Sequence, residues 1–318
     1  MTATSTDVAR EAGVSRATVS QVLNGHAHRF AAETAAKVFD AAKSLGYEPS
    51  AAGRTLRKGS SDFVVALLPN VTFGTNLQQL FEEMSSDLSA HGYSLVLRMS
   101  SESTDALDRV IASLRPAAVF SLARFTDAER AVFEARGTLA IDPPSASVID
   151  SHRAIGEMQA RALVAAGHSR LGFVHLSDVR QDPFGAGREE GVRAVAEQLG
   201  LPEPRVAFSD IDLDQAIAAL QSLEPPGIAI ACYNDDVAMT MMAAARVLEL
   251  DVPGDVAIIG MDHTALSRVT VPRLTTIEYD LARAASEGTA QLLDSLGAGR
   301  PVTRNVGTAL RLVPGETV

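Results

Sequence analysis

The stretch GIAIACYNDDVAM (227–239) joins two patterns that together decide the fold. Its first half is a continuous run of small and apolar residues, which is typical of a strand buried on both faces of a parallel sheet. Asn234 and Asp235 then interrupt the run, and their side chains can cap the helix expected over residues 236–249. We therefore expect a strand, a polar turn and a helix in direct succession.

Six further apolar runs alternate with amphipathic stretches along the middle of the chain. These runs cover residues 63–69, 93–99, 117–123, 139–142, 171–176 and 256–262. Helical spacing of apolar residues fills the intervals, for example at 77–90, 155–166 and 187–199. Strands that alternate with helices form parallel sheets, and this many units favours two sheets over one. We therefore predict an α/β core of two doubly wound parallel-sheet lobes.

The first 47 residues lack strand signals and predict an all-α unit of three helices. The expected helices cover about 4–12, 15–23 and 32–45, and the second ends at Asn24-Gly25. Thr4 and Ser15 supply hydroxyl groups that can cap the first two helices.

The spacing of Ala9, Gly13 and Val19 is that of a helix-turn-helix, because a small residue lets two helices approach and glycine permits the sharp turn. In such a unit the second helix presents its N-terminal end to the major groove of DNA. The outward residues of that helix are Ser15, Arg16, Ala17, Thr18 and Gln21. Arg16 suits guanine and Gln21 suits adenine. A small helical bundle with these side chains merely solvated fits the same spacing.

Charge is divided unevenly along the chain, whose formal net charge is −11. Residues 1–60 carry a net +3, so the remainder carries −14. Because phosphate contacts come from clustered Lys and Arg, the N-terminal part is the one expected to meet a polyanion. The single cysteine, Cys232, excludes an internal disulfide. No run is apolar enough for a membrane span or a signal peptide, which predicts a cytoplasmic protein.

Longer motifs carry a resemblance to a known family. The segments TDVAREAGVSRATVSQVLNG (6–25) and AAKSLGYEPSAAGRTLRKG (41–59) closely resemble the headpiece of the LacI/GalR family of bacterial transcription regulators. The resemblance continues through GHSRLGFV (167–174), YNDDVAM (233–239) and VPGDVAIIGMDH (252–263), and so covers nearly the whole chain. It implies a homodimeric repressor that binds palindromic operator DNA, with a core similar to periplasmic binding proteins of type I.

The resemblance also implies a division into three parts. A helix-turn-helix DNA-binding domain would occupy residues 1–47, a hinge segment 48–60, and an effector-binding and dimerisation core 61–318. Within the core, the expected lobes are an N-lobe of about 61–148 plus 277–302 and a C-lobe of about 149–276 plus 303–318.

In this family the hinge folds as a helix only on operator DNA, where its leucine wedges into the minor groove. By motif the hinge contacts are Ala52, Arg54 and Leu56, although Leu56 could instead pack the head onto the core. The remaining expected DNA contacts are Thr4, Asn24 and Arg29. Gln21 stands where the family frequently has a base-reading arginine, so we expect a different operator.

Effector contacts are also implied by the resemblance. Arg188, Asn234 and Asp262 match family positions and offer hydrogen-bond donors, a carboxamide and a carboxylate for a small polar ligand such as a sugar. Each also has a structural alternative: a surface ion pair, a helix cap and a turn residue. Four further candidates lie on expected neighbouring loops: Phe73, Asp150, His152 and Arg153. The two arginines and the histidine favour an anionic ligand, such as a phosphorylated sugar or a carboxylate.

Enzyme signatures do not occur in the sequence, which has no GxxxxGK[ST] phosphate loop, no GxGxxG after the first strand and no GxSxG. The seven histidines show no metal-ligand spacing, and GAG (185–187) alone is a very weak phosphate signal. We therefore expect a regulator that is not an enzyme and needs no cofactor or metal. The alternative is a family member without a small-molecule response, which binds DNA constitutively or under the control of a protein partner.

Overall fold

A computed structural model describes residues 3–47, 59–68, 75–100, 103–142, 145–177, 184–298 and 310–318 of the chain. These residues form two compact units, an N-terminal helical head and an α/β core that begins at Phe63. None of the helices in these ranges combines the length and apolar character that crossing a membrane requires.

The head contains the three expected helices. They are α1 (Ser5–Ala12), α2 (Arg16–Gln21) and α3 (Ala32–Ser44). Val8, Val19, Val22 and Val38 form its core, each at most 1% exposed. The small residues of α1 and α3 let the helices approach, so a short segment still encloses an apolar centre.

The end of the second helix differs from the prediction. Instead of stopping at Asn24-Gly25, the chain continues as a π turn, η1 (Val22–His26), and a 3-10 turn, η2 (Ala27–Arg29). Val22 is buried against the other helices, so packing holds the backbone in a wider turn past the expected stop signal. Helix α3 then begins at Ala32 without a side-chain cap, because Ala31 has no hydroxyl group.

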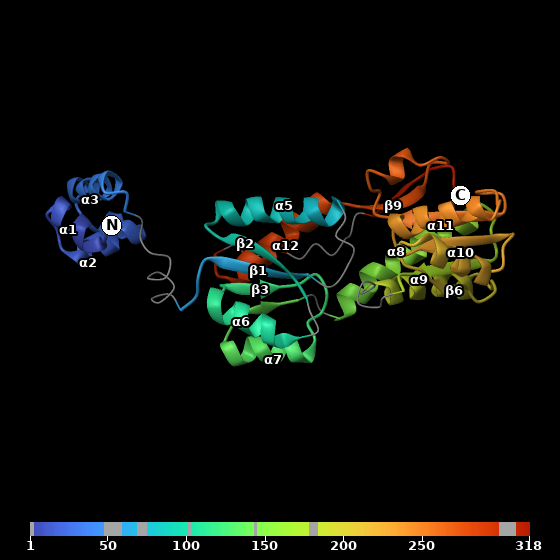
Figure 1. The fold of residues 1–318 in the computed structure, drawn as a ribbon, viewed down its shortest axis with the longest axis horizontal. Helices are drawn as coiled ribbons and strands as arrows, with labels where there is room; N and C mark the ends of the chain where they lie inside the picture. Colours follow the sequence, from blue (N-terminus) through green and yellow to red (C-terminus); the bar gives the residue numbers. More distant parts are fainter. Residues whose placement is uncertain are drawn as a thin grey trace. The chain divides into compact units, whose positions relative to one another are not determined.

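The N-lobe is a four-stranded parallel sheet with helices on both faces. In chain order its elements are β1 (Phe63–Leu68), α5 (Thr75–Ala90), β2 (Ser94–Met99), α6 (Thr104–Leu114), β3 (Ala118–Phe120), α7 (Asp127–Arg136) and β4 (Ala140–Ile141). The strand order is β2-β1-β3-β4. Figure 1 shows α6 and α7 on one face, and α5 with α12 (Leu281–Ser295) on the other.

The C-lobe is a larger sheet of six strands in the order β10-β9-β8-β7-β5-β6. Its elements are α8 (Ser145–Ala165), β5 (Leu171–His175), α9 (Gly185–Gln198), β6 (Arg205–Phe208), α10 (Leu213–Ser222), β7 (Ile228–Cys232), α11 (Asp235–Val247), β8 (Val256–Met261), η3 (Ser267–Val269), β9 (Thr275–Tyr279) and β10 (Leu310–Val313). All neighbouring strands are parallel except β10, which pairs antiparallel with β9.

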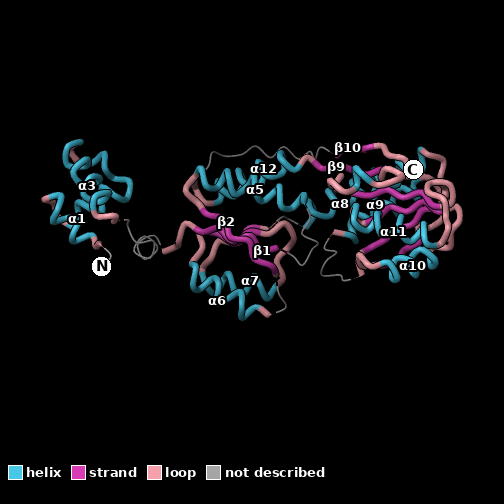
Figure 2. The backbone as a smooth tube through the Cα atoms, turned by 45° about the horizontal axis from the view of Figure 1, so that its top comes forward, coloured by secondary structure: helices cyan, strands magenta, loops and turns pink. Residues whose placement is uncertain are grey.

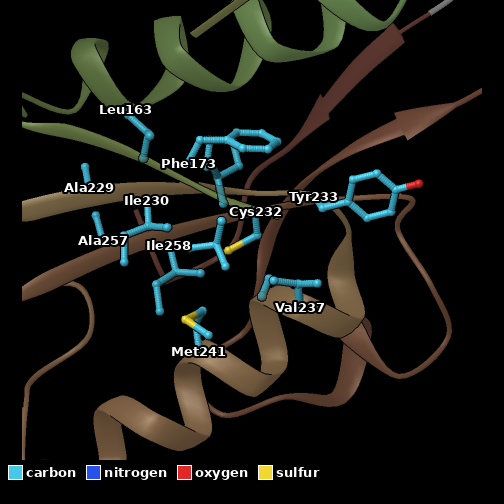
Figure 3. Close-up of a cluster of buried hydrophobic side chains, with 14 of the residues drawn as sticks. Leu163, Phe173, Ala229, Ile230, Cys232, Tyr233, Val237, Met241, Ala257 and Ile258 are labelled. Carbon is cyan, nitrogen blue, oxygen red and sulfur yellow. The ribbon is translucent and has the colours of Figure 1, made fainter. Parts of the chain in front are cut away.

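The core of the C-lobe explains why its strands are continuously apolar. Every residue of β5, β7 and β8 is buried, because α8 and α9 pack together on one side and α10 and α11 on the other. The strand order explains the two layers: the chain goes from β5 to the edge strand β6 and then returns past β5 to β7 and β8, so crossover helices of one hand cover opposite faces of the sheet. Figure 3 shows side chains of α8 and α11 meeting those of β7 and β8 in this core.

The chain returns from the C-lobe to the N-lobe after β9. Strand β9 belongs to the C-lobe sheet, and the helix that follows it, α12, packs beside α5 in the N-lobe (Figure 2). Strand β9 runs to Tyr279, three residues past the lobe boundary expected at 276. The two-lobed parallel-sheet fold predicted from the sequence is confirmed. Because parallel strands all end at one edge, residues after β5, β7 and β8 gather there.

Candidate functional site

The first turns of two capped helices form the candidate DNA-binding surface of the head. In a capping box at the start of α1, the Thr4 N–H donates to the Asp7 carboxylate at 3.0 Å. At the start of α2, the Thr18 N–H donates to the Ser15 hydroxyl at 3.0 Å. These caps set the direction in which α2 leaves the turn, and Arg16 lies exposed directly after the second cap.

Most of the sequence-predicted DNA contacts that the structure describes are exposed. The exposed residues are Thr4, Ser15, Arg16, Ala17, Gln21 and Arg29. Thr18 is partly buried, and its hydroxyl lies 2.9 Å from that of Ser15. Asn24 lies in the π turn, and its side chain is outside the described residues, as are Ala52, Arg54 and Leu56 of the hinge.

Two glycines allow α8 and α9 to cross in close contact at the C-lobe site. A Cβ atom on Gly156 would lie 1.8 Å from the Arg188 carbonyl oxygen, and one on Gly191 would lie 2.1 Å from that of Arg153. Any larger residue at these positions would push one backbone away from the other. The crossing therefore holds the first turns of α9 against α8, near enough for the charge of Arg188 to act on His152.

Arg188 is a buried cation at this crossing, with 5% of its surface exposed. Its Nη1 donates to the backbone oxygen of Tyr233, and its guanidinium lies over the Tyr233 ring, 4.8 Å from the ring centroid. Its Nε is buried and has no hydrogen-bond partner among the described residues. Arg188 is therefore not part of a surface ion pair, which was the structural alternative for it. Its Nε remains as an unused hydrogen-bond donor near the end of β7.

His152 presents a second unused polar atom. Its ring stacks on that of Phe184, with 4.3 Å between centroids and 12° between planes, and its buried Nδ1 has no partner within the described ranges. Burial, with the charge of Arg188, lowers the pKa of His152 to about 3, so the ring is neutral near pH 7. A neutral imidazole offers a ligand one donor and one acceptor.

The loop expected to carry residues 150–153 is part of a helix, which corrects the sequence prediction. Helix α8 begins at Ser145 rather than near residue 155. Asp150 lies in this helix, but its side chain is outside the described residues. Arg153 is not part of the buried group, because its guanidinium pairs with Glu157 at 3.1 Å and with Glu190 at 3.4 Å. Phe73 also lies outside the described residues.

Asn234 acts as a helix cap at the end of β7. The Val237 N–H donates to Asn234 Oδ1 at 2.9 Å, and this bond fixes the first turn of α11. The side chain is nearly buried beside Tyr233, so its oxygen is committed to the cap. The carboxamide nitrogen of Asn234, whose two N–H groups the cap does not use, is the part best able to meet a ligand.

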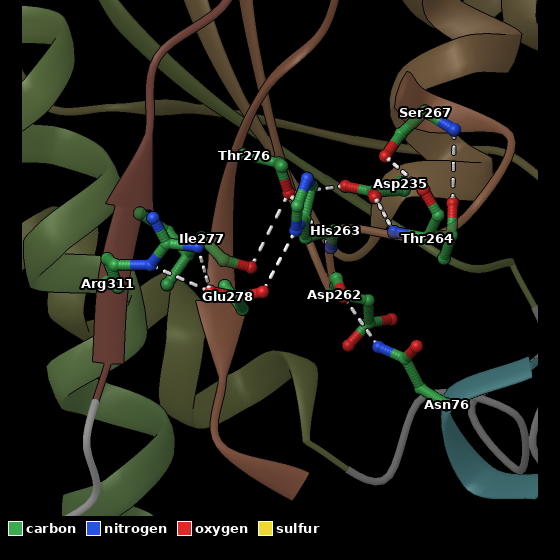
Figure 4. A network of polar contacts seen from close by, with 10 residues as sticks. All are labelled: Asn76, Asp235, Asp262, His263, Thr264, Ser267, Thr276, Ile277, Glu278 and Arg311. Atoms are coloured by element: carbon green, nitrogen blue, oxygen red, sulfur yellow. Dashed lines mark hydrogen bonds and ion pairs between the residues drawn. The ribbon is translucent and has the colours of Figure 1, made fainter. Parts of the chain in front are cut away.

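Asp262 ends β8 in an unusual backbone conformation. Its φ is 112°, and that of His263 is 50°, both in the region that glycine prefers. Such conformations cost free energy for other residues and gather at functional sites. The loop is held by buried Asp235, which accepts from the Thr276 hydroxyl at 2.5 Å and from the Thr264 N–H at 2.8 Å (Figure 4).

The carboxyl group of Asp262 changes its protonation state near physiological pH. Burial raises its pKa to about 7, while the charge of Arg188 opposes this rise and the carboxylates of Asp235 and Asp236 add to it. Asp262 can therefore donate a hydrogen bond when protonated and accept one when ionised. Asp262 is also a turn residue, as its positive φ shows, so the turn alternative and a contact with a ligand remain compatible.

A pocket of about 540 Å³ lies beside Asp262 and takes residues from both lobes. Asn76 and Gln79 of α5 line it together with Tyr279 of β9, and Asn76 Nδ2 donates to the Asp262 carbonyl oxygen at 2.5 Å. This volume suits a small ligand. Sequence reasoning missed these three residues, because none follows an apolar run and only the return of β9 toward the N-lobe brings Tyr279 to α5.

The described residues contain no group of three or more His, Cys, Asp and Glu side chains that could hold a metal ion. Cys232 is buried in the sheet, and burial raises the pKa of its thiol far above its usual range.

A helix-turn-helix head with exposed polar side chains, on a core of two parallel-sheet lobes, defines a DNA-binding regulator.

Comparisons with known proteins identify the family. Residues 4–50 match "Bacterial regulatory proteins, lacI family", and residues 160–318 match "Periplasmic binding protein-like domain". The chain is similar to the HTH-type transcriptional repressor PurR of Yersinia pestis (strain Pestoides F), with 28% identity over 340 residues, 99% of this chain and 97% of the relative. The chain belongs to the LacI family, and it is a transcriptional repressor that binds DNA and not an enzyme.

Solved structures share the fold. The Lac repressor dimer bound to operator and the anti-inducer ONPF has a TM-score of 0.77 and 22% identity, covering 100% of this chain and 99% of that one. The complex of the transcriptional regulator CelR with cellobiose has a TM-score of 0.68 and 22% identity, covering 99% of this chain and 100% of that one.

Proposed function

We propose that a small polar effector, a sugar or a related metabolite, binds where the C-lobe strands end and sets the affinity of the repressor for operator DNA. The observation that carries this proposal is a pair of buried atoms, Arg188 Nε and His152 Nδ1, which have no partner among the described residues. Buried polar atoms are nearly always hydrogen-bonded, so two unpaired atoms together mark a place for a ligand. Asp262 adds a carboxyl group on the same sheet edge.

The effector would act by favouring one arrangement of the lobes. Asn76 of the N-lobe bonds to the backbone of Asp262 in the C-lobe, and β9 leads directly into α12 of the N-lobe. A ligand that contacts both sides of this junction changes the free-energy difference between open and closed arrangements. In our proposal the head is 1–47, the hinge 48–60 and the core 61–318, and the change reaches DNA through hinge residue Leu56.

We further propose that the repressor works as a homodimer in the cytoplasm, with each head on one half-site of a palindromic operator. Exposed apolar side chains gather on the segment after β8: Leu266 is 65% exposed, Val269 73% and Val271 91%. Gathered apolar groups of this kind mark interaction surfaces. A second copy would cover them through a twofold contact, and the similar Lac repressor forms a dimer on its operator.

A thermal-shift screen of the full chain tests the effector proposal. Sugars, sugar phosphates, nucleosides and small acids are the compounds to screen, and we expect one class to raise the melting temperature and to change operator affinity in a gel-shift titration. Asp262→Ala should abolish both responses. If no compound changes operator affinity, the protein is a family member without a small-molecule response.

Sedimentation of Val271→Asp tests the dimer. A charged side chain at this exposed position should leave the fold intact and shift the protein to monomers, because a buried unpaired carboxylate opposes association. Val247→Asp, which alters an exposed apolar residue on α11 outside this segment, is the control. A Val271→Asp protein that remains dimeric would place the interface elsewhere.

A further inference from the structure

A buried glutamine on α8 contacts the two strands that lead to Asn234 and Asp262. Gln159 has none of its surface exposed, and its amide nitrogen donates to the backbone oxygen of Cys232 at 2.9 Å and to that of Gly260 at 3.0 Å. Cys232 is the last residue of β7, and Gly260 is the next-to-last residue of β8. One side chain therefore joins the ends of two neighbouring strands.

This joint lies where the backbone ladder between the two strands has ended. The last residues of β7 and β8 that pair with each other are Ala231 and Ile259. The next residues along, Cys232 and Gly260, pair instead with the strands on their other sides, β5 and β9. The two hydrogen bonds of Gln159 therefore take the place of the backbone bonds that hold parallel strands together.

Two residues beyond the joint, each strand supplies a candidate ligand contact. Asn234 follows Cys232 by two positions, and Asp262 follows Gly260 by two. Neighbouring strands lie about 4.8 Å apart while a ladder joins them, and they can separate where it ends. Because one amide nitrogen holds both backbone oxygens, Gln159 limits how far β7 and β8 separate before these two side chains.

The end of β8 is also held from the opposite face of the sheet. Gly260 has no side chain, and a Cβ atom there would collide with the carboxylate of Asp235, the first residue of α11. Helix α8 packs on the other side of the sheet from α11. The backbone that leads to Asp262 is therefore fixed between Asp235 and Gln159.

The same helix also contacts the segment that supplies Arg188. Gly156, one turn before Gln159, lies against the backbone oxygen of Arg188. Helix α8 thus touches the backbone of α9, β7 and β8, the elements that provide or precede the candidate ligand contacts. A residue on this helix is well placed to fix their mutual distances.

Stability gives a weaker reason for a glutamine at this position. The amide oxygen of Gln159 is buried and has no hydrogen-bond partner among the described residues. The cost of one buried unpaired acceptor is comparable to the net gain from two neutral hydrogen bonds. The geometry that the two bonds impose is therefore the larger consequence of this side chain.

We infer that Gln159 is a positioning residue of the effector site, which sets the spacing between Asn234 and Asp262 by tying the ends of β7 and β8 together. The inference rests on the proposed function, because it concerns the side chains that would hold that ligand. Gln159 acts through two backbone oxygens and does not itself contact the ligand.

Gln159→Met tests the tie, because methionine has a similar size and donates no hydrogen bond. The readout is the titration of Asp262 in the full chain, followed by NMR of the side-chain carboxyl carbon and assigned with Asp262→Asn. Burial raises the pKa of Asp262 to about 7. Release of the strand end would admit water, so we expect this pKa to fall by about one unit or more. The side-chain amide signals of Asn234 should shift as well.

A purely structural role predicts a different result, a lower melting temperature with the titration of Asp262 unchanged. Gln159→Asn is a second variant in case Gln159→Met fails to fold. It keeps the amide but is one methylene shorter, so it cannot reach both backbone oxygens, and the pKa of Asp262 should again fall. Gln198→Met, at an exposed glutamine of α9, is the matched control and should leave the titration unchanged.

An unchanged titration of Asp262 in the Gln159 variants would overturn the positioning role. If that result is found while a compound from the thermal-shift screen changes operator affinity, the proposed function stands and the positioning role is wrong. If the titration shifts but no compound changes operator affinity, the tie between the strands stands and the proposed function is wrong.

Discussion

The head and the C-lobe site present polar groups in two different ways. On the head, the candidate contacts between Ser15 and Gln21 lie close together in the sequence, and one capped helix presents them. In the C-lobe, Arg188, Asn234 and Asp262 come from three separate crossovers, and His152 comes from a fourth element. Local hydrogen bonds suffice to build the first surface, whereas the second exists only when the whole sheet has folded.

Glycines show the same difference. Gly13 has a φ of +66°, and no atom lies within 4 Å of the place that a Cβ would take, so its role is to turn the backbone. Gly156 lies within α8 and has no positive φ, but a Cβ there would lie 1.8 Å from the Arg188 carbonyl oxygen. One glycine serves a local conformation, and the other serves contact between elements far apart in sequence.

Substitution of Gly156 should have the largest effect. Gly156→Ala forces α8 and α9 apart, and we expect it to lower the free energy of unfolding by ~3 kcal/mol or more, as overpacking against backbone does. Gly13→Ala should cost only about 1 kcal/mol, through its positive φ. Urea unfolding of both variants measures this. Equal losses would show that the two glycines do not differ in role.

Arg16→Ala should have the next largest effect, and it should change only which DNA sequence the protein prefers. Loss of a bidentate contact to guanine should reduce discrimination between the best binding site and mismatched sites by about 1–3 kcal/mol, with the fold unchanged. The best binding site can be selected from a random DNA library, and gel shifts then measure the affinities for this site and for mismatched sites. Lys43→Ala, an exposed charge on α3, is the control. Unchanged sequence preference in Arg16→Ala would remove Arg16 from base recognition.

Asp262→Asn should make the core more stable at high pH. The folded-state pKa of about 7 exceeds the ordinary value of 3.8, so the folded state holds a proton between pH 4 and 7 that the unfolded state releases. The Asp262 contribution to stability is thus present below pH 4 and lost as pH rises to 7, by at most ~4 kcal/mol.

Because Asp262 keeps part of its surface exposed, we expect the variant to gain about 1–2 kcal/mol at pH 8 and less at pH 5. Urea unfolding at both pH values measures the difference. The lowered pKa of His152 makes stability fall as the pH drops below 6.5. Because His152 is present in both proteins, its contribution cancels in the difference between them. Asp294→Asn, at an exposed carboxylate, is the control, and an equal gain at both pH values would contradict the prediction.

Ser15→Ala should have the smallest effect, a local one. Loss of the bond from the Thr18 N–H should destabilise α2 by about 1 kcal/mol, which hydrogen exchange of residues 16–22 would report as roughly fivefold faster exchange. Ser15→Asp should restore protection, because its carboxylate also caps a helix. Exchange unaffected by Ser15→Ala would show that tertiary packing alone holds α2.

Strong local patterns allowed most of the fold to be predicted. Continuous apolar runs identified β5, β7 and β8, which are buried throughout. Strands β6, β9 and β10 were not predicted, because each has partly exposed residues and lacks a continuous apolar run. The start of α8 at Ser145 was also missed, since apolar spacing in residues 145–154 is weak.

The sequence by itself determined the helix-turn-helix, the alternation of strands and helices, and the residues that follow each strand. Caps and apolar periodicity act over three or four residues, so a single chain segment records them. Only the tertiary structure decided that Arg188 is buried and unpaired while Arg153 pairs with glutamates, and that Tyr279 and Asn76 line the pocket beside Asp262. Burial and pairing depend on neighbours contributed by distant elements, and no local pattern specifies those neighbours.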